Sequence, residues 1–243
     1  WNPKMSPYIY GKRNLIHIID LRETVRGLLR GMHLLRSIAS AGEQILFVGT
    51  KRQVKDLLEG EAKRANMPFV AERWIGGTLT NYDVIRRRLG RLEELEQIEA
   101  EADFSRYSKK MMSSFRREKR KISRNLEGIR NMNRLPGALF VIDPRREENA
   151  LREAARLGIP TVCLADTDCN PDLVDILIPA NDDALKSVTL IMRFAVDAIL
   201  EGLANADERA MVREQQREAS AIQEPRPMSG RTRGRRSRGG RGG

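Results

Sequence analysis

The sequence contains only two cysteines and two histidines, which narrows the chemistry that the protein can perform. Cys163 and Cys169 lack the C-x-x-C spacing and no second pair follows, so neither a disulfide framework nor a zinc module is expected. His17 lies inside an apolar run, where we expect a packed core residue rather than a ligand. Because no Ser/His/Asp, Cys/His or paired-carboxylate pattern is present, we expect the protein not to be an enzyme.

Long apolar runs are also missing. No run reaches the roughly 18 residues that a membrane-spanning helix requires, so no such helix is expected. Because the chain begins with Trp1 and not with Met, the sequence does not allow a signal peptide to be judged. Two reduced thiols in a chain of this composition indicate a cytoplasmic protein.

Positive charge, by contrast, is abundant. The 243 residues carry a formal net charge of +11, and 40% of them are hydrophobic. This length and apolar content suffice for one α/β domain with appendages. The excess of cations predicts a polyanionic partner, and composition alone leaves RNA, DNA and an acidic membrane surface open.

Short apolar runs predict the strands of the domain. After an irregular, proline-broken start over residues 1–13, a first run covers residues 15–19. Runs that are apolar on both faces, as in buried parallel strands, follow at residues 45–48, 68–71, 138–142, 161–164 and 176–179.

Helical patterns separate these runs. Asp20 can cap a helix that Gly42 ends, and a second helix follows the turn after residue 48 and reaches Ala65. A third helix is predicted from Asp143 as N-cap, with Pro144 at its first position, to Gly158. A long amphipathic helix covers about residues 184–203. The alternation predicts an α/β fold with a doubly wound parallel sheet.

The middle of the chain differs, because residues 82–133 hold almost no strand signal and many charges. Two apolar stripes, separated by a loop near residues 103–108, predict two long helices packed as an antiparallel hairpin. The first helix is acidic in its second half and the second helix is basic, so opposite charges are expected to pair them, with the excess cations facing out.

The predicted organisation has four parts. Residues 1–20 form an N-terminal arm with the first strand, residues 20–81 and 134–204 the sheet domain, and residues 82–133 the inserted hairpin. Residues 205–243 are expected to be a flexible basic tail, disordered from about residue 223, where arginines alternate with glycines in a composition that suits flexible RNA contact.

Three segments contain candidate site residues. Gly49-Thr50-Lys51 follows a strand but lacks the full phosphate-loop pattern, since Ile45 stands where its first glycine belongs. Lys51 and Arg52 are either phosphate contacts at the sheet edge or solvated helix-start residues. In the segment that holds Gly76 and Gly77, Trp74 beside Arg73 either stacks on a base or sugar, or is a core residue beside a tight turn.

The third segment is an acidic cluster formed by Asp166, Asp168, Asn170 and Asp172. It begins like a calcium loop, but Pro171 stands where a glycine is needed and Leu177 where the bidentate glutamate should be. Asp166 and Asp168 are weak candidates for adventitious magnesium at an RNA interface. The alternative is that these residues close a turn and cap a helix. No cofactor is otherwise expected.

Ordered motifs spread over residues 1–203 resemble the small-subunit ribosomal protein S-two family of bacteria and organelles. The motifs are Trp-Asn-Pro-Lys-Met at residues 1–5, Ile-His-Ile-Ile-Asp-Leu at 16–21, Phe-Val-Gly-Thr-Lys at 47–51, Trp-Ile-Gly-Gly-Thr-Leu-Thr-Asn at 74–81, Leu-Pro at 135–136 with Phe-Val-Ile-Asp at 140–143, Gly-Ile-Pro-Thr at 158–161, and the stretches 166–173 and 178–183.

The resemblance implies a flavodoxin-like sheet with a protruding helical hairpin and a role as a structural component of the small subunit. It implies binding to small-subunit ribosomal RNA and help in docking ribosomal protein S-one, on a ribosome in the cytoplasm or in an organelle matrix or stroma. No catalysis, cofactor, membrane contact or homo-oligomer comes with it. The short helix that family members carry before the first motif is not in this sequence, so the contact with S-one is expected to be incomplete, and the Arg/Gly tail lies outside the resemblance.

We therefore expect placement on RNA through phosphate neutralisation. The candidate contacts lie in the N-terminal arm, at the sheet edge and on the hairpin: Asn2, Lys4, Lys12, Arg13, Lys51, Arg52, Arg73, Trp74, Asn81, Arg86, Arg87, Arg88, Lys109, Lys110, Arg116 and Arg117. One alternative is an enzyme or binder that holds a phosphorylated small molecule where Lys51 and the acidic cluster converge. Another is a free RNA or membrane-surface binder that acts through the tail.

Overall fold

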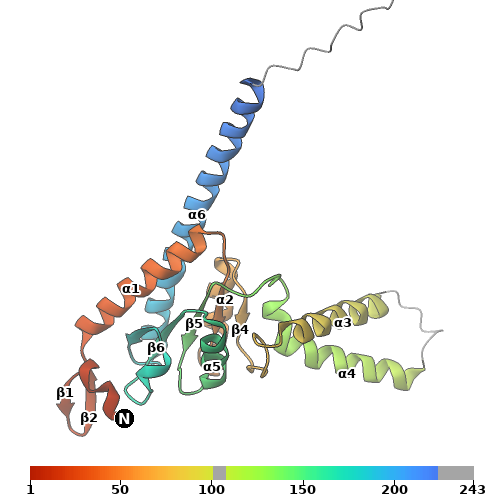
Figure 1. Cartoon of the computed structure of the whole chain (residues 1–243). Helices are drawn as coiled ribbons and strands as arrows, with labels where there is room; N and C mark the ends of the chain where they lie inside the picture. The colour runs from red at the N-terminus through yellow and green to blue at the C-terminus, as the bar shows by residue number, and fades with distance from the viewer. Residues whose placement is uncertain (101–107, 224–243) are drawn as a thin grey trace, which may run out of the picture. The chain divides into compact units, whose positions relative to one another are not determined.

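The computed structural model describes residues 1–100 and 108–223 (Figure 1). The chain divides into two compact units, Trp1–Ala206 and Asp207–Gly243. The first unit contains the sheet, the helices that cover it and the helical hairpin. Of the second unit, only the continuation of a helix to residue 223 is described.

A parallel sheet of five strands forms the centre of the first unit. The strands are β3 (Ile45–Val48), β4 (Phe69–Val70), β5 (Ala138–Ile142), β6 (Thr161–Ala165) and β7 (Ile176–Pro179), in the order β4-β3-β5-β6-β7. Every residue of β3, β5 and β6 is buried, which explains why these runs are apolar on both faces. Counted from β3, the order is 2-1-3-4-5, so the predicted flavodoxin-like topology is confirmed.

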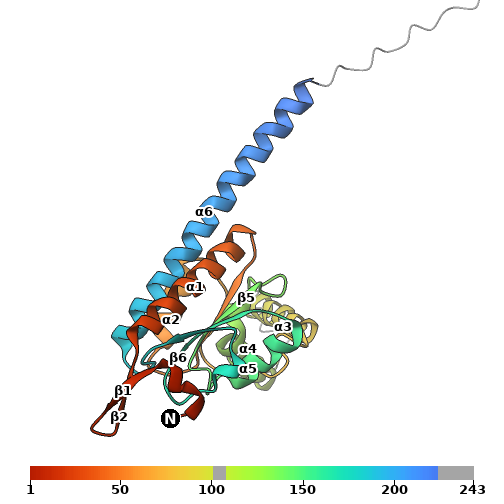
Figure 2. The ribbon, with the colours of Figure 1, turned by 60° about the vertical axis from the view of Figure 1, so that its left-hand side comes forward.

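Helices cover both faces of the sheet, as the doubly wound prediction requires (Figures 1 and 2). One apolar core lies between the sheet and three helices, α1 (Leu21–Ser40), α2 (Lys55–Arg64) and the first part of α6 (Leu185–Gln223). The other core contains residues of α5 (Glu148–Leu157) and of the base of the hairpin. The inserted hairpin is therefore anchored in the core of the domain.

Helix α1 crosses β7 at close range. Asp20 caps it as predicted, since its carboxylate accepts a hydrogen bond from the Arg22 backbone N–H at 2.9 Å. A Cβ atom on Gly27 would lie 2.2 Å from the Leu177 carbonyl oxygen, so only glycine allows this approach. The backbone of α1 thus determines how closely the helix packs on the sheet.

The N-terminal segment is more regular than its two prolines indicated. A 3-10 helix, η1 (Pro3–Tyr8), leads into β1 (Ile9–Arg13), which pairs antiparallel with β2 (Ile16–Ile19). Asn14 and Leu15 both have positive φ angles, the backbone that a two-residue hairpin turn requires. The expectation of an irregular start was wrong, and the apolar run at residues 15–19 belongs to this hairpin rather than to the parallel sheet.

Two predicted helix boundaries were also wrong. Asp143 does not cap α5, because its φ of 62° is left-handed and its carboxylate instead accepts from the Arg146 N–H, within the turn that precedes the helix. At Gly158 the prediction is confirmed, since this residue ends α5 with φ 68°. Helix α6 does not end near residue 203 but continues to Gln223, so residues 205–223 are helical rather than the start of a flexible tail.

The predicted helical hairpin is confirmed as α3 (Tyr82–Ala100) and α4 (Lys109–Leu126), which lie side by side and protrude from the sheet (Figure 1). A short 3-10 helix, η2 (Glu127–Ile129), follows α4, and another, η3 (Pro171–Leu173), precedes β7. The loop predicted near residues 103–108 falls mostly outside the described residues. A Cβ on Gly128 would lie 2.2 Å from the Phe69 carbonyl oxygen, so the hairpin base packs tightly against β4. Within the described ranges, no helix is long and apolar enough to cross a membrane.

Candidate RNA interface

The two helices of the hairpin are joined by opposite charges, as their composition predicts. Glu99 of α3 accepts from Lys119 of α4 at 2.7 Å and lies 3.6 Å from Arg116. Arg91 of α3 lies 3.5 Å from Glu118 of α4. These pairs join the two helices through Glu99 and Glu118 and involve only some of the hairpin's cations.

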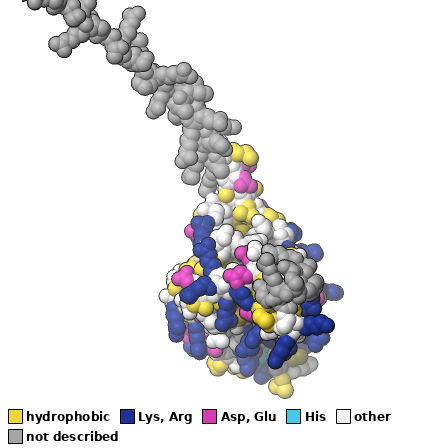
Figure 3. Space-filling view, turned by 90° about the vertical axis from the view of Figure 1, so that its right-hand side faces the viewer, with side chains coloured by type: hydrophobic (Ala, Val, Ile, Leu, Met, Phe, Trp, Pro, Cys, Tyr) yellow, Lys and Arg dark blue, Asp and Glu magenta, His cyan; other side chains and the backbone are white. Residues whose placement is uncertain are grey.

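The remaining cations of the hairpin are exposed and have no carboxylate partner among the described residues. We call this set the hairpin cations: Arg86, Arg87, Arg88, Lys109, Lys110, Arg117, Arg120, Lys121 and Arg124. Figure 3 views the molecule from the side of the hairpin and shows Lys and Arg side chains spread over this face. Because an unpaired cation in water does not have to give up an ion pair to bind a phosphate, this surface suits a polyanion.

The loop from Arg73 to Asn81 is held by one buried side chain, Glu153 of α5. Its Oε1 accepts from the Trp74 indole N–H at 2.9 Å and from the Gly77 N–H at 2.8 Å. Its Oε2 accepts from the N–H groups of Leu79 and Thr80 and from the Thr80 hydroxyl. Burial alone would raise the pKa of Glu153, but these hydrogen bonds outweigh it and the pKa lies below its usual value.

This network favours the core interpretation of Trp74. The side chain is only 9% exposed and its indole N–H is satisfied by Glu153, so it is a core residue that presents only a small part of its surface at the loop. Arg73 and Asn81, at the two ends of the same loop, are exposed. The sequence motif therefore contributes its flanking residues to the surface and its tryptophan to the core.

The carboxyl edge of the sheet, where flavodoxin-like proteins bind ligands, is filled by the chain's own side chains. Glu147 is 2% exposed and accepts from the Thr50 N–H at 2.9 Å. Lys51 donates to Asp182 at 2.9 Å and lies 2.5 Å from Asp183. Hydrogen bonds to these carboxylates outweigh burial and raise the pKa of Lys51.

A phosphate at this edge would meet fixed negative charge. Burial raises the pKa values of Glu147 and Asp182; the carboxylate of Asp143 acts on both in the same direction, and that of Asp166 acts on Asp182. The small-molecule alternative needed Lys51 to be available for a phosphate. Because Lys51 is already paired twice, the structure removes the observation that favoured this alternative, and Lys51 is not an accessible RNA contact.

The acidic cluster after β6 does not converge on a metal position. Asp168 pairs with Arg145 at 2.6 Å, and Asp166 accepts from the adjacent Thr167 N–H. Asn170 caps η3 by accepting from the Asp172 N–H. In the described part of the chain, no group of three or more His, Cys, Asp or Glu side chains could hold a metal ion. The turn-and-cap interpretation is the one that the contacts support.

The remaining candidates in the N-terminal arm and at the sheet edge differ in availability. Lys4 pairs with Asp172, and the Asn2 side chain is used to cap η1. Lys12, Arg13 and Arg52 are exposed and have no carboxylate partner among the described residues. These three cations extend the accessible positive surface beyond the hairpin.

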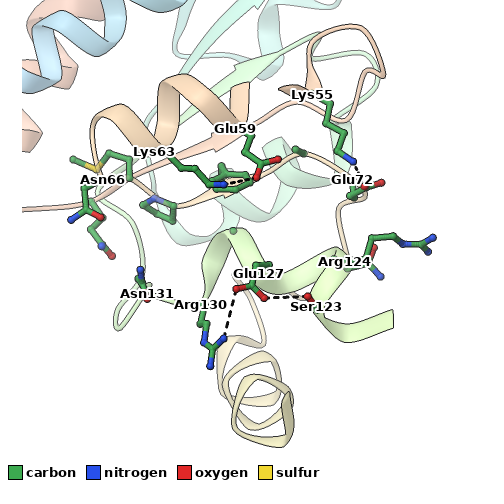
Figure 4. A pocket seen from close by; sticks show the side chains of 17 residues that line it. Lys55, Glu59, Lys63, Asn66, Glu72, Ser123, Arg124, Glu127, Arg130 and Asn131 are labelled. Carbon is green, nitrogen blue, oxygen red and sulfur yellow. Dashed lines mark hydrogen bonds and ion pairs between the residues drawn. The ribbon is translucent and has the colours of Figure 1, made fainter. Parts of the chain in front are cut away.

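Two cavities flank the base of the hairpin. The first, of about 430 Å³, lies between α2, β4 and the end of α4, and we call it the hairpin-base cavity (Figure 4). Its cations are largely neutralised: Lys63 donates to Glu59 at 2.7 Å, Lys55 pairs with Glu72, and Arg130 lies 3.7 Å from Glu127. The second, which we call the loop cavity, has a volume of about 530 Å³. It is lined by Arg73 and Arg88, and also by Lys121, which was not among the residues predicted to contact RNA.

A different kind of surface lies at the opposite end of the unit. A groove of about 1000 Å³ runs between the β1–β2 hairpin, α1 and α6, and we call it the N-terminal groove. Its walls include large apolar side chains that are exposed to solvent: Trp1, Leu15, Ile16, Ile18, Leu21, Val25, Leu190 and Phe194. A continuous apolar surface of this kind is typical of protein contacts rather than RNA contacts.

Fold and surface together define an α/β platform with a cationic helical arm. The family model described as "Ribosomal protein S2" matches residues 1–202. Over 202 residues the sequence is 58% identical to small ribosomal subunit protein uS2 of Rhodopirellula baltica, covering 83% of this chain and 78% of that relative. Proteins of the same name from Borrelia hermsii and Borrelia duttonii are 46% identical over 200 residues, covering 82% of this chain and 79% of each relative. The chain belongs to the ribosomal protein S2 family.

Proposed function

We propose that this family member is a structural constituent of the small ribosomal subunit that binds small-subunit ribosomal RNA and helps to dock ribosomal protein S-one. The observation that carries the RNA part is the set of hairpin cations, which are exposed and lack carboxylate partners among the described residues. Membership of the ribosomal protein S2 family supports the small-subunit assignment.

In this proposal the protein acts by binding at a fixed position on the RNA and not by catalysing a reaction. Each hairpin cation that meets a phosphate releases a condensed counterion, so binding is driven by entropy and weakens steeply with salt. A-form RNA presents its backbone and 2′-hydroxyl groups rather than its base edges, so the hairpin is expected to recognise shape. The sheet, with β3, β5 and β6 fully buried, gives the hairpin a rigid base.

The contact with ribosomal protein S-one is assigned to the N-terminal groove. Among the described residues that line the groove, Lys12 is the one lysine or arginine, so the groove offers little to a phosphate backbone. Burying apolar side chains such as Leu190 and Phe194 against a protein partner gains roughly 25 cal/mol per Å². Leu190→Asp combined with Phe194→Asp is expected to abolish capture of purified S-one while leaving RNA binding intact. If this variant captures S-one like the wild type, the assignment of the groove is wrong.

The RNA proposal is tested by removing four cations of the hairpin together. Changing Lys109, Lys110, Arg116 and Arg117 to Ala leaves the buried stripe of the hairpin untouched. Of the ion pairs between the two helices within the described ranges, it removes only that of Arg116 with Glu99 at 3.6 Å, and Lys119 still pairs with Glu99, so the fold is expected to persist. Affinity for transcribed small-subunit rRNA should fall, and the slope of log K against log salt should flatten by roughly 0.9 for each lost phosphate contact.

The matched control removes four cations that pair with carboxylates elsewhere on the surface: Lys63, Arg64, Arg152 and Arg193. Both variants lose the same net charge. We expect the control to retain rRNA affinity and incorporation into subunits. Equal losses in both variants would show that net charge, and not the hairpin, is responsible, and unchanged binding of the hairpin variant would contradict the proposal.

A further inference from the structure

The loop cavity has an apolar floor and a rim of cations that are unpaired among the described residues, a combination that the hairpin-base cavity lacks. The loop cavity lies where the loop of residues 73–76 faces α3 and α4, and its volume of about 530 Å³ falls in the range of small-molecule sites. Its floor is apolar, formed by Trp74, Ile75, Ile122 and Leu126. The hydrogen bond from the Trp74 indole N–H to Glu153 holds the part of this floor that belongs to the loop in place.

The rim of the loop cavity is cationic and available. Arg73, Arg88 and Lys121 are exposed and have no carboxylate partner among the described residues. The fourth cation, Arg91, is held by Glu94 at 2.9 Å and by Glu118 at 3.5 Å. Arg73, Arg88 and Lys121 therefore line the same cavity as the apolar side chains, whereas other hairpin cations lie on the open surface of a helix.

The neighbouring hairpin-base cavity shows that this arrangement is specific to one site. It is lined by four cations and three carboxylates, and most of its cations are paired (Figure 4). The loop cavity is lined by four cations and one carboxylate. Of the two cavities at the base of the hairpin, the loop cavity is therefore the one that suits an anion.

We propose that the loop cavity takes one unstacked nucleotide of the ribosomal RNA. The base lies on the apolar floor, and its flanking phosphates are bound by Arg73, Arg88 and Lys121. This inference deepens the proposed RNA-binding function and rests on it. Unpaired bases in loops and bulges are the parts of RNA that proteins insert into pockets, because their faces are free to pack.

One polar side chain is placed to contact the base edge. The Asn125 amide nitrogen donates to the Lys121 carbonyl oxygen at 3.1 Å, which orients the amide and leaves its Oδ1 to accept a hydrogen bond. An exocyclic amino group of adenine, cytosine or guanine can donate to this oxygen. Because the imino N–H of uracil can donate to the same oxygen, this contact is expected to orient the base without selecting one of the four.

The test fills the cavity without changing its charge. Gly76 lines the cavity, has no positive φ, and a Cβ atom there would meet nothing within 4 Å, so Gly76→Leu adds a bulky apolar side chain at the cavity without backbone strain. The matched control is Gly60→Leu on α2, where an added Cβ also meets nothing within 4 Å and which does not line the cavity.

Two readouts are made with the full chain on transcribed small-subunit rRNA. Gly76→Leu should weaken binding on the order of tenfold, the effect of losing one packed base. A few bases that the wild type protects from base-specific chemical modification should regain reactivity, while backbone protection elsewhere persists. Gly60→Leu should behave like the wild type in both measurements.

A second variant, Arg73→Ala with Lys121→Ala, adds no side chain to the loop and should expose the same bases. It keeps the test decisive if Gly76→Leu does not fold. Wild-type affinity and wild-type protection in both variants would overturn the nucleotide site but leave the proposed function standing. Loss of another ribosomal protein from reconstituted subunits, with RNA protection intact, would assign the cavity to an acidic protein segment and overturn the inference. Failure of the wild-type protein to bind the rRNA would overturn the proposed function itself.

Discussion

Replacing Glu153 by Gln tests how the loop of residues 73–81 is held on the sheet domain. Both carboxylate oxygens of Glu153 accept hydrogen bonds, from five donors in all. Glutamine keeps the size of the side chain but replaces one oxygen by an NH₂ group. Whichever way the amide turns, at least two donors then face another donor.

The magnitude follows from the burial of these groups. Glu153 is 7% exposed, so donors that lose their acceptor cannot reach water without moving the loop. Each buried unsatisfied donor costs about 1–3 kcal/mol, so the loss of two acceptor contacts in Glu153→Gln should lower the free energy of unfolding by roughly 2–6 kcal/mol. At roughly 2–4 °C per kcal/mol for a unit of this size, the melting temperature should fall by several degrees.

Glu147→Gln is the matched control, because it makes the same chemical change at another buried glutamate. Glu147 uses only Oε1, which accepts from Thr50, and a glutamine Oε1 accepts equally well. Burial raises the pKa of Glu147, so burial opposes ionisation of this carboxyl, and the amide removes that cost. Differential scanning calorimetry at pH 7 should show a loss of stability for Glu153→Gln and none for Glu147→Gln. Equal effects of the two substitutions would refute the reasoning from donor counts.

Three further predictions concern the fold and its pH dependence. Gly27→Ala should destabilise the protein by about 1–3 kcal/mol in urea unfolding, because its Cβ would overlap the Leu177 carbonyl, whereas Gly90→Ala, whose Cβ meets nothing within 4 Å, should not; equal midpoints would contradict the close packing of α1. Lys51→Ala should cost about 3 kcal/mol, since it leaves Asp182, 5% exposed, without its cation, and an unchanged melting temperature would show that the pair is not formed. The pKa of Glu153 is lowered in the folded state, so the carboxylate stabilises the fold at pH values above its ordinary pKa of about 4.5, and this stabilisation is lost as the pH falls through the pKa of the folded state. Acid unfolding of Glu153→Gln should therefore depend less on pH below about pH 4.5 than that of the wild type. Parallel unfolding curves would contradict the lowered pKa.

The sequence predicts the layers of this fold well, because its strands and helices differ in period. Runs such as Ala138–Ile142 are apolar throughout and were identified as buried strands, and Gly158 was identified as a helix end. The boundaries that failed depend on backbone that composition does not show. Asp143 adopts a left-handed conformation, and the β1–β2 hairpin turns at Asn14 and Leu15 without a glycine.

The candidate site was predictable in kind but not in detail. Charge composition indicated that the hairpin cations would face outward, because the carboxylates of α3 are too few to pair with the cations of α4. Which cations are free is a matter of tertiary contacts. Lys51 is neutralised by Asp182 and Asp183, 131 and 132 positions away in the chain, and Trp74 is held by Glu153. No local pattern reports such contacts, and Lys121 joins Arg73 only through packing of the hairpin against the loop.

Sedimentation of a cell lysate at low magnesium, where ribosomal subunits separate, tests the central claim most directly. The protein is followed by immunoblot across the gradient, beside the four-alanine hairpin variant expressed at the same level. The account predicts that the wild-type chain co-migrates with the small subunit and that a larger share of the variant remains at the top. A wild-type chain that stays at the top of the gradient, whether or not subunits are being assembled, would contradict a structural role in the ribosome.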